Sequence, residues 1–116
     1  MRTIELNGRW KAIKDFPDYL ISDKGEVLSL RCMRMLKPYV NHKGYLKIGL
    51  ADGHGKDHKK RINRLVAEAF IPNPLGLPEV NHKNLNKQDN RVCNLEWVTG
   101  QQNREHFLKA KLQGVS

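Results

Sequence analysis

The stretch VNHKNLNKQDNRVCNLEWVT, residues 80–99, decides the fold of this chain. Two short segments, residues 79–82 and 95–98, have the apolar and β-branched side chains of strands, and a polar loop separates them. They predict a pair of short β-strands. Thr99 and Gln102 then have the spacing of a capping box, which predicts that a helix begins here. The C-terminal third of the chain is therefore predicted to run strand, loop, strand and helix.

One histidine in this stretch has asparagines on several sides in the predicted unit. Asn81 and His82 end the first strand, Asn94 comes directly before the second, and Asn103 lies in the first turns of the helix, which we expect to end near Gln113. A strand pair packed against that helix would bring these four side chains together. Asparagines in loops often bond to nearby backbone groups, so several others in the stretch are expected to be structural.

Residues 1–62 predict a small antiparallel meander with a basic face. The expected strands are residues 10–13, 19–22, 26–30, 44–50 and 57–62, with turns at residues 16–18, 23–25 and 52–56 and a strand end at Pro38. Asn63 is expected to cap a helix that ends before Pro72. The predicted fold class is α+β, with a basic sheet module in residues 1–62 and a helix plus the strand–loop–strand–helix unit in residues 63–116.

Length and composition exclude several classes of protein. A chain of 116 residues suits one domain, or two small subdomains that share a core. Its 39% apolar and 28% charged residues are typical of a soluble globular protein, and no apolar run predicts a membrane span or a signal peptide. The two cysteines, Cys32 and Cys93, have no CxxC spacing, which argues against a disulfide framework or a thiolate zinc site and suits a reducing compartment.

The formal net charge of +9 is concentrated in one part of the chain. Residues 31–64 contain ten basic and two acidic residues, a net +8. Such a band can neutralise phosphates and release counterions, which is typical of nucleic-acid binding, although a solvated basic face with no partner has the same composition. The candidate nucleic-acid-binding residues are Arg34, Lys37, Lys43, Lys47, Lys59, Lys60, Arg61 and Arg64.

Together, these motifs resemble those of the phage- and intron-associated HNH homing endonucleases, over about residues 10 to 106. The stretch quoted above matches almost continuously, as does the segment Arg64-Leu-Val-Ala-Glu-Ala-Phe-Ile-Pro-Asn-Pro74. The shorter upstream matches, typical of a module often fused to these nucleases, are Trp10-Lys11-x-Ile13, Phe16-Pro17-x-Tyr19-x-Ile21-Ser22, Gly25-x-Val27-x-Ser29, Leu36-Lys37-Pro38 and Gly44-Tyr45.

The resemblance implies a ββα-metal active site in which each matching residue has a role. His82 would be the general base that takes a proton from the attacking water. Asn81 and Asn103 would supply side-chain oxygens to one divalent cation, Mg²⁺, with Mn²⁺ able to substitute and no zinc site. Asn94 would hold the His82 imidazole in the right orientation and tautomer. His106, one turn after Asn103, would be a further ligand, a phosphate contact or an ordinary surface residue.

Each of these roles also has an independent chemical reason. An imidazole with a pKa near 6.5 can accept a proton at neutral pH. Oxygen ligands suit Mg²⁺, which keeps several waters and is completed by substrate phosphate. Two neutral amides do not offset the charge of the cation, so more of that charge acts on the phosphate. The same neutrality predicts weak metal binding until DNA arrives.

The implied function is phosphodiester hydrolysis in double-stranded DNA, with one strand nicked by each active site. The protein would act as a monomer or weak dimer in the cytoplasm of a bacterial host and would be encoded by a phage. The main alternative is a catalytically silent, DNA-binding regulatory protein on the same scaffold. A third reading, an RNA-binding module, rests on the charge alone, since no pattern of RNA-stacking aromatic residues is present.

Three positions depart from the family pattern. Asn63 stands where the family usually has histidine, and Leu85 stands where the loop usually has glycine. Since leucine is poor at positive φ, we expect either a different turn or Asn84 in the left-handed conformation. Asn81 replaces an aspartate of some relatives, which should weaken the metal site without abolishing it. Asn63 and Leu85 keep the catalytically silent alternative open.

Overall fold

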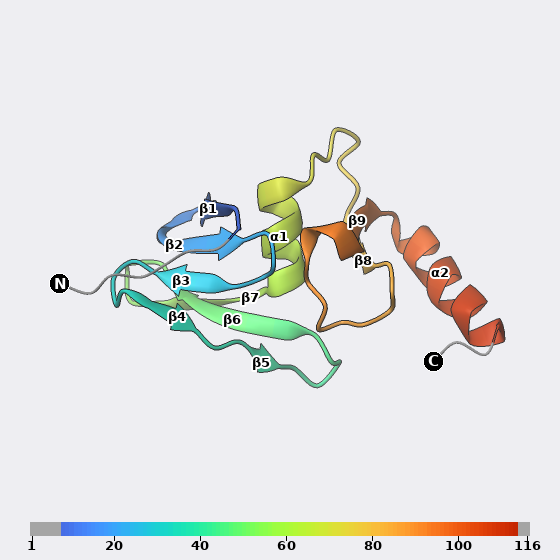
Figure 1. Cartoon of the computed structure of the whole chain (residues 1–116), viewed down its shortest axis with the longest axis horizontal. Coiled ribbons are helices and arrows are strands. Elements are labelled where there is room, and N and C mark those ends of the chain that lie inside the picture. The colour runs from blue at the N-terminus through green and yellow to red at the C-terminus, as the bar shows by residue number, and fades with distance from the viewer. Residues whose placement is uncertain (1–7, 114–116) are drawn as a thin grey trace.

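The structure, a computed structural model, describes residues 8–113 (Figure 1). The strands and helices in that range are β1 (Trp10–Ile13), β2 (Phe16–Ser22), β3 (Val27–Ser29), β4 (Arg34–Leu36), β5 (Tyr39–Val40), β6 (Leu46–Ala51), β7 (Asp57–Arg61), α1 (Ile62–Phe70), β8 (Glu79–His82), a 3-10 turn (Val92–Asn94), β9 (Leu95–Val98) and α2 (Gly100–Leu112). The predicted α+β class is confirmed.

The strands before α1 form two antiparallel sheets, where the sequence predicts one meander. β1–β4 make a four-stranded sheet and β5–β7 a three-stranded sheet. Pro38 lies between β4 and β5, and because proline has no N–H to donate to a ladder, the chain leaves the first sheet there. The turn expected at residues 16–18 is also wrong. The tight turn comes earlier, where Asp15 has a φ of 68°, and β2 begins at Phe16.

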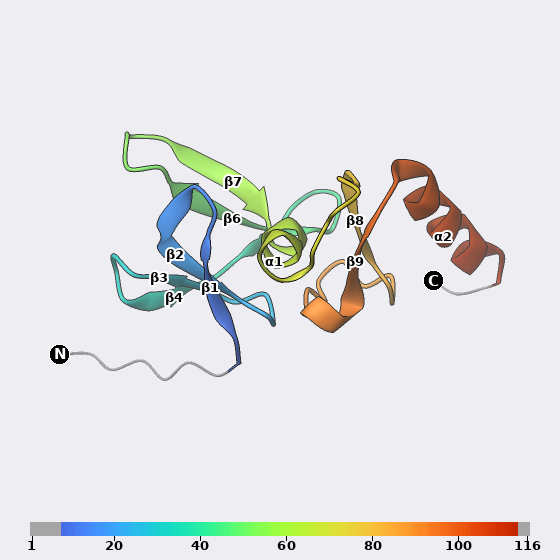
Figure 2. The same cartoon turned by 90° about the horizontal axis from the view of Figure 1, so that it is seen from above.

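A single hydrophobic core joins the sheets to the C-terminal unit. α1 contacts strands of all three sheets, including β8 and β9, and Figure 2 shows it end-on between the N-terminal sheets and the β8–β9 pair. Ile21, Leu50, Ile62 and Val66 are fully buried in this core. Since the core runs through the junction of residues 62 and 63, the division of the chain at that point stays a prediction.

Asn63 does not cap α1 as predicted. β7 runs directly into the helix, so the helix begins at Ile62, two residues earlier than a cap at Asn63 implies, and the cap residue is Arg61 without a side-chain bond. Asn63 lies inside the first turn and is buried against β8, where its Nδ2 donates to the Val80 carbonyl at 3.5 Å. Its Oδ1 is buried without a partner. The amide therefore serves as a packing residue between α1 and β8.

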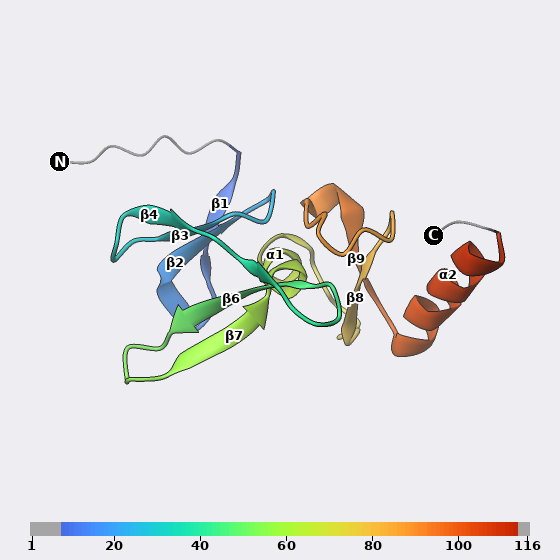
Figure 3. The ribbon, with the colours of Figure 1, turned by 90° about the horizontal axis from the view of Figure 1, so that it is seen from below.

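The final helix, α2, begins as the sequence predicts. The Thr99 hydroxyl accepts from the Gln102 backbone N–H, and the Gln102 side chain accepts from the Thr99 N–H, so the capping box is complete. The helix ends at Leu112 and its cap is Gln113. Figure 3 shows α2 at the end of the molecule, beyond β8 and β9, and none of its residues is buried. Neither helix in residues 8–113 is long and apolar enough to cross a membrane.

Candidate active site

The β8–β9 pair holds the central residues of the predicted site. Its register places Asn81 opposite Glu96 and His82 opposite Leu95, at the end of β8 where the loop begins. Both Asn81 and His82 are buried, with 6% and 5% of their surface exposed. A polar side chain at this depth needs partners or a cavity to face.

Such a cavity lies beside the strand pair and has a volume of about 850 Å³. Asn81, His82 and Asn103 all line it, so the structure brings together three of the four residues predicted for the site. Lysine and arginine side chains from the loop and from α2 also line it: Lys87, Arg104 and Lys111. The cavity therefore combines a histidine, two amides and several positive charges, a composition suited to a phosphate group.

The ring of His82 is held by Asn90 and not by Asn94. The His82 Nε2 donates to the Asn90 Oδ1 at 2.8 Å, within the buried part of the loop. This fixes the tautomer, because Nε2 carries the proton and Nδ1 is the nitrogen with a free lone pair.

Burial lowers the pKa of His82 from its ordinary value of 6.5, because a charged imidazolium is poorly solvated there. The Asn90 bond and the negative charge of Asp89 act in the opposite direction and raise it, while the positive charge of Lys87 lowers it further. The net direction favours the neutral imidazole, the form that can accept a proton near neutral pH.

Asn94 has a structural position at the base of the loop. Its Nδ2 donates to the Asn84 Oδ1 and to the Asp89 carbonyl, both at 2.9 Å, and its Oδ1 accepts from the Asn84 backbone N–H at 3.0 Å. These bonds use both N–H groups of the Asn94 amide and direct the side chain to the loop, while the His82 ring bonds to Asn90. Asn94 instead closes the loop whose far side carries Asn90.

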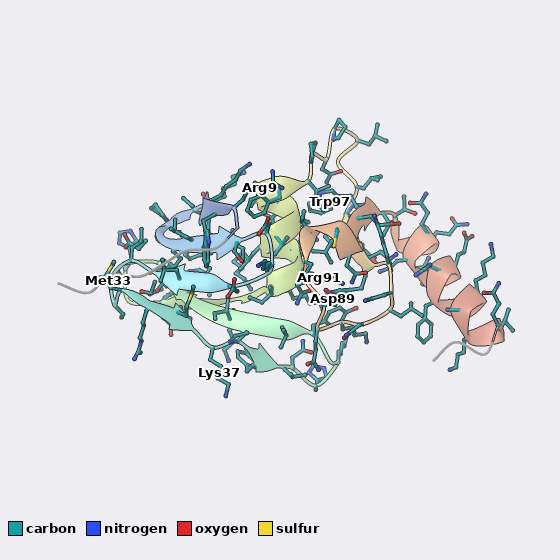
Figure 4. The ribbon with its side chains drawn as sticks, viewed as in Figure 1. Arg9, Met33, Lys37, Asp89, Arg91 and Trp97 are labelled. Atoms are coloured by element: carbon teal, nitrogen blue, oxygen red, sulfur yellow. The ribbon has the colours of Figure 1, made fainter. Side chains whose placement is uncertain are left out.

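The loop has two further supports. Leu85 adopts the left-handed conformation itself, with a φ of 67°, which corrects the expectation of either a different turn or a left-handed Asn84. Its backbone N–H donates to the His82 carbonyl at 2.9 Å, which holds the turn despite the unfavourable side chain. Arg91 forms two 2.8 Å bonds to Asp89, the pair seen beside the loop in Figure 4, and holds the pKa of that carboxyl well below its usual range.

Asn103 on α2 contacts β8 through a carboxylate. The Asn103 Nδ2 donates to the Glu79 Oε1 at 2.9 Å, which leaves the amide oxygen as the atom available to another partner. Asn81 lines the same cavity. Within residues 8–113 no three His, Cys, Asp or Glu side chains cluster as a metal site. The two asparagine side chains that line the cavity nevertheless offer amide oxygens, which fit a hard, partly hydrated cation such as Mg²⁺.

The structure places His106 beside the loop and gives its ring a backbone partner. The His106 Nε2 lies 3.1 Å from the Lys83 carbonyl oxygen, a contact between α2 and the start of the loop. His106 is not among the residues that line the cavity. This contact indicates that His106 helps to hold α2 against the loop, rather than acting as a metal ligand.

The predicted nucleic-acid-binding residues fall on different surfaces. The register of β6 and β7 pairs Lys47 with Arg61 and Gly49 with Lys59, and directly opposite residues share a face, so Lys47, Lys59 and Arg61 lie together. We call these three residues the outer basic face of β6–β7. Ile48 and Leu50 point the other way, into the core.

The remaining basic residues lie elsewhere. Lys60 is opposite Ile48, on the other side of the sheet, with its Nζ 5.7 Å from the centre of the Phe16 ring. Arg64 is used by the fold: its Nη1 donates to the Pro78 carbonyl at 2.7 Å, and its guanidinium lies 5.3 Å from the Trp97 ring centre. Arg34, Lys37 and Lys43 are exposed on β4 and the loops that follow, and Lys37 extends away from the body in Figure 4.

Sequence reasoning missed a cluster that links the basic face to His82. Tyr45 lies next to His82, with ring centres 6.0 Å apart, and two cations lie over its ring: Arg61 at 4.2 Å and Lys87 at 4.8 Å. The Lys87 Nζ also donates to the Lys43 carbonyl at 2.8 Å, which ties the loop to the β5–β6 turn. Asn90 and Glu79 were missed as well. Spacing alone does not separate Asn90 from its neighbouring loop asparagines.

Comparison with known proteins identifies two matching sequence families. Residues 60–105 match the HNH endonuclease family, and residues 9–51 match the NUMOD4 motif. The first range covers α1, β8, β9 and the start of α2, and the second covers strands β1 to β6.

Individual relatives show the same relationship. An uncharacterized HNH endonuclease of Acanthamoeba polyphaga mimivirus is 40% identical over 94 residues, which are 81% of this chain and 28% of that protein. The DNA endonuclease I-HmuI of Bacillus phage SP01 is 37% identical over 108 residues, which are 92% of this chain and 62% of that protein.

Structural comparison agrees with the sequence matches. A solved structure titled "DNA binding and cleavage by the HNH homing endonuclease I-HmuI" is similar to this chain with a TM-score of 0.79 and 37% identity. The match covers 93% of this chain and 60% of that one. In each of these comparisons the chain spans less than two thirds of the length of the relative. With its sequence matches, its fold and its buried histidine in agreement, the chain belongs to the family of HNH homing endonucleases.

Proposed function

We propose that this protein is a Mg²⁺-dependent DNA endonuclease that hydrolyses a phosphodiester bond and nicks one strand of double-stranded DNA. One observation carries the proposal: a buried, oriented histidine with a lowered pKa shares a cavity with two asparagine side chains and several cations. A catalytically silent regulator would not need the His82 ring to be held in one tautomer with a lowered pKa.

His82 acts as the general base in this proposal. With its Nε2 proton committed to Asn90, its Nδ1 takes the proton from the attacking water. The lowered pKa keeps that nitrogen unprotonated near neutral pH, which is the condition for a base to work there. The Asn90 bond also lets the ring accept the proton, because a hydrogen bond to Nε2–H stabilises the imidazolium that forms.

Asn81 and Asn103 would hold the cation through their side-chain oxygens. When bound, a divalent cation stabilises the negative charge that develops on the phosphate and on the leaving oxygen. Mn²⁺ is expected to substitute for Mg²⁺. Because both protein ligands are neutral, we expect weak metal binding in the absence of DNA.

DNA would reach this cavity across the outer basic face of β6–β7. Arg61 belongs to that face and lies over Tyr45, whose ring is next to His82, so a continuous path of positive charge leads to the base. Lysine and arginine side chains on such a face would contact DNA phosphates, and phosphate contacts position the duplex without reading its sequence. We place the protein, as a monomer or weak dimer, in the cytoplasm of its host, where its free and exposed cysteines stay reduced.

A plasmid-nicking assay tests the proposal. His82→Ala should slow nicking of supercoiled plasmid in Mg²⁺ by at least ~10²-fold, the usual scale for loss of a general base, and leave DNA affinity nearly unchanged. The matched control is His54→Ala, which removes an exposed histidine in the β6–β7 turn and should cut like the wild type. Equal cutting by His82→Ala and the wild type would end the catalytic role, and absence of cutting by the wild type would favour the silent regulator.

A further inference from the structure

We infer that Glu79 is the positioning residue of the metal site: its carboxylate fixes the side-chain amide of Asn103 so that the oxygen, and not the nitrogen, faces the cavity. The inference rests on the proposed metal role of Asn103. Glu79 is not one of the residues that the resemblance to HNH endonucleases implies for the site.

The pairing of β8 with β9 brings Glu79 beside the start of α2. Glu79 is the first residue of β8 and pairs with Val98, the last residue of β9. The helix begins two residues later, at Gly100, with Thr99 as its cap. A side chain leaving β8 at this position therefore meets the first turn of α2, where Asn103 lies.

The contact itself selects one orientation of the amide. The Asn103 Nδ2 donates to the Glu79 Oε1 at 2.9 Å. A carboxylate only accepts hydrogen bonds, so it binds the NH₂ end of an amide and never the oxygen end. An Asn103 side chain turned by 180° would put oxygen against oxygen. The bond therefore leaves Oδ1 as the end of the amide that can approach a cation.

Gly100 supports this interpretation independently. Gly100 is the first residue of α2 and lies beside the Glu79 carboxylate. A Cβ at Gly100 would lie 2.8 Å from the Glu79 Oε2 and 3.3 Å from the Arg104 Nη1. The missing side chain makes room for the second carboxylate oxygen, and the glycine thus keeps Glu79 in the position from which it holds Asn103.

Glu79 also has a structural effect that the test must separate. The first turn of α2 contains no acidic residue, so the Glu79 carboxylate supplies the negative charge that favours a helix N-terminus. A purely structural role would make stability depend on this charge and leave metal affinity unaffected. A positioning role depends on an acceptor oxygen, which glutamine also provides.

The experiment compares Glu79→Ala with Glu79→Gln. Binding of Mn²⁺ to the protein–DNA complex is measured by electron paramagnetic resonance, alongside the Mn²⁺ concentration that half-saturates nicking and the melting temperature. Both variants lose the charge and should melt at similarly lower temperatures. Glu79→Ala should weaken Mn²⁺ binding by roughly 10-fold to 100-fold, the scale for loss of a residue that orients a metal ligand, and Glu79→Gln should recover most of it.

Two controls sharpen the comparison. Glu105→Ala removes another carboxylate of α2, one that accepts a hydrogen bond from Gln101. This variant should leave Mn²⁺ binding unchanged. In an Asn103→Ala background, Glu79→Ala should add no further loss, because the two residues act through one amide. Gly100→Ala should weaken Mn²⁺ binding by crowding the carboxylate, although alanine is the better helix former.

The outcomes are distinct. Equal loss in Glu79→Ala and Glu79→Gln would overturn positioning and assign the effect to the charge, and no loss in either would make the role purely structural. Both results are read from Mn²⁺ binding. If Mn²⁺ binding follows the expected order but His82→Ala nicks like the wild type, the proposed general base fails and the role of Glu79 stands.

Discussion

His82 illustrates how several neighbours set the chemistry of one residue. Burial and the positive charge of Lys87 lower its pKa, while Asn90 and Asp89 raise it. Lys87 is exposed and lies in the loop that covers the ring, so it can be changed without disturbing the core. The balance of these effects determines the pH at which the base form appears.

Replacing Lys87 should therefore shift the pH dependence of cleavage. Lys87→Ala removes a charge that lowers the His82 pKa, so that pKa rises and the base is protonated at a higher pH. The acidic limb of the profile of the nicking rate against pH should move to higher pH. Lys109→Ala, which removes an exposed lysine from the last turn of α2, should leave the limb in place. A limb that stays fixed in Lys87→Ala would show that another group titrates.

Leu85 carries backbone strain that a substitution can release. A non-glycine residue in the left-handed region costs about 1–2 kcal/mol, and its φ is 67°. Leu85→Gly should raise the free energy of unfolding by up to about 1 kcal/mol in urea, after the loss of side-chain contacts and the entropy of glycine are included. The control is Leu75→Gly, which changes an exposed leucine whose φ is not positive. It should not raise the free energy of unfolding. A destabilised Leu85→Gly would show that its side chain packs more strongly than the backbone is strained.

At the scale of elements, alternation in β7 separates two adjacent lysines. Lys59 belongs to the outer basic face of β6–β7, and Lys60 lies on the opposite side of the sheet near Phe16. If DNA runs along the outer face, Lys59→Ala should reduce the slope of log K against log[salt] by about 1, the value for one phosphate contact. Lys60→Ala should leave the slope close to that of the wild type. Equal slopes for the two variants would place the DNA elsewhere.

The sequence predicts some elements at their observed bounds and others poorly. β8, β9 and the α2 capping box follow from short-range patterns, namely apolar segments beside a polar loop and a Thr–Gln spacing. The sheet division and the start of α1 depend on how distant strands pack, which local patterns do not contain. The sequence predicts that Asn63 caps the helix. In the structure it is a buried packing residue, because β7 leads directly into the helix.

The candidate site divides in the same way. His82, Asn81 and Asn103 are identified by the family resemblance, and the structure brings them to one cavity. Asn90 and Glu79 are not identified, because their importance comes from which atom they touch. Asn94 and Asn90 lie in one asparagine-rich loop, and only the folded loop shows that Asn90 contacts the imidazole while Asn94 closes the backbone.

For the whole molecule, the N-terminal sheets and the HNH unit act as one body. The core is continuous through α1, and Tyr45, from the N-terminal part, lies against both His82 and the loop cation Lys87. A change in the basic sheet that moves Tyr45 would therefore reach His82 directly. Binding and cleavage should be coupled through this contact rather than residing in two independent modules.

α2 does not share this continuous core, since none of its residues is buried. The energy that holds it comes from the Thr99 cap, the Asn103–Glu79 bond and the His106 contact with the loop, not from an apolar interface. Segments of this kind detach at a free-energy cost well below that of global unfolding. One of the two proposed metal ligands, Asn103, therefore lies on a part of the protein that can detach alone. If the proposal holds, both ligands would be in place together only while a bound duplex keeps that end closed.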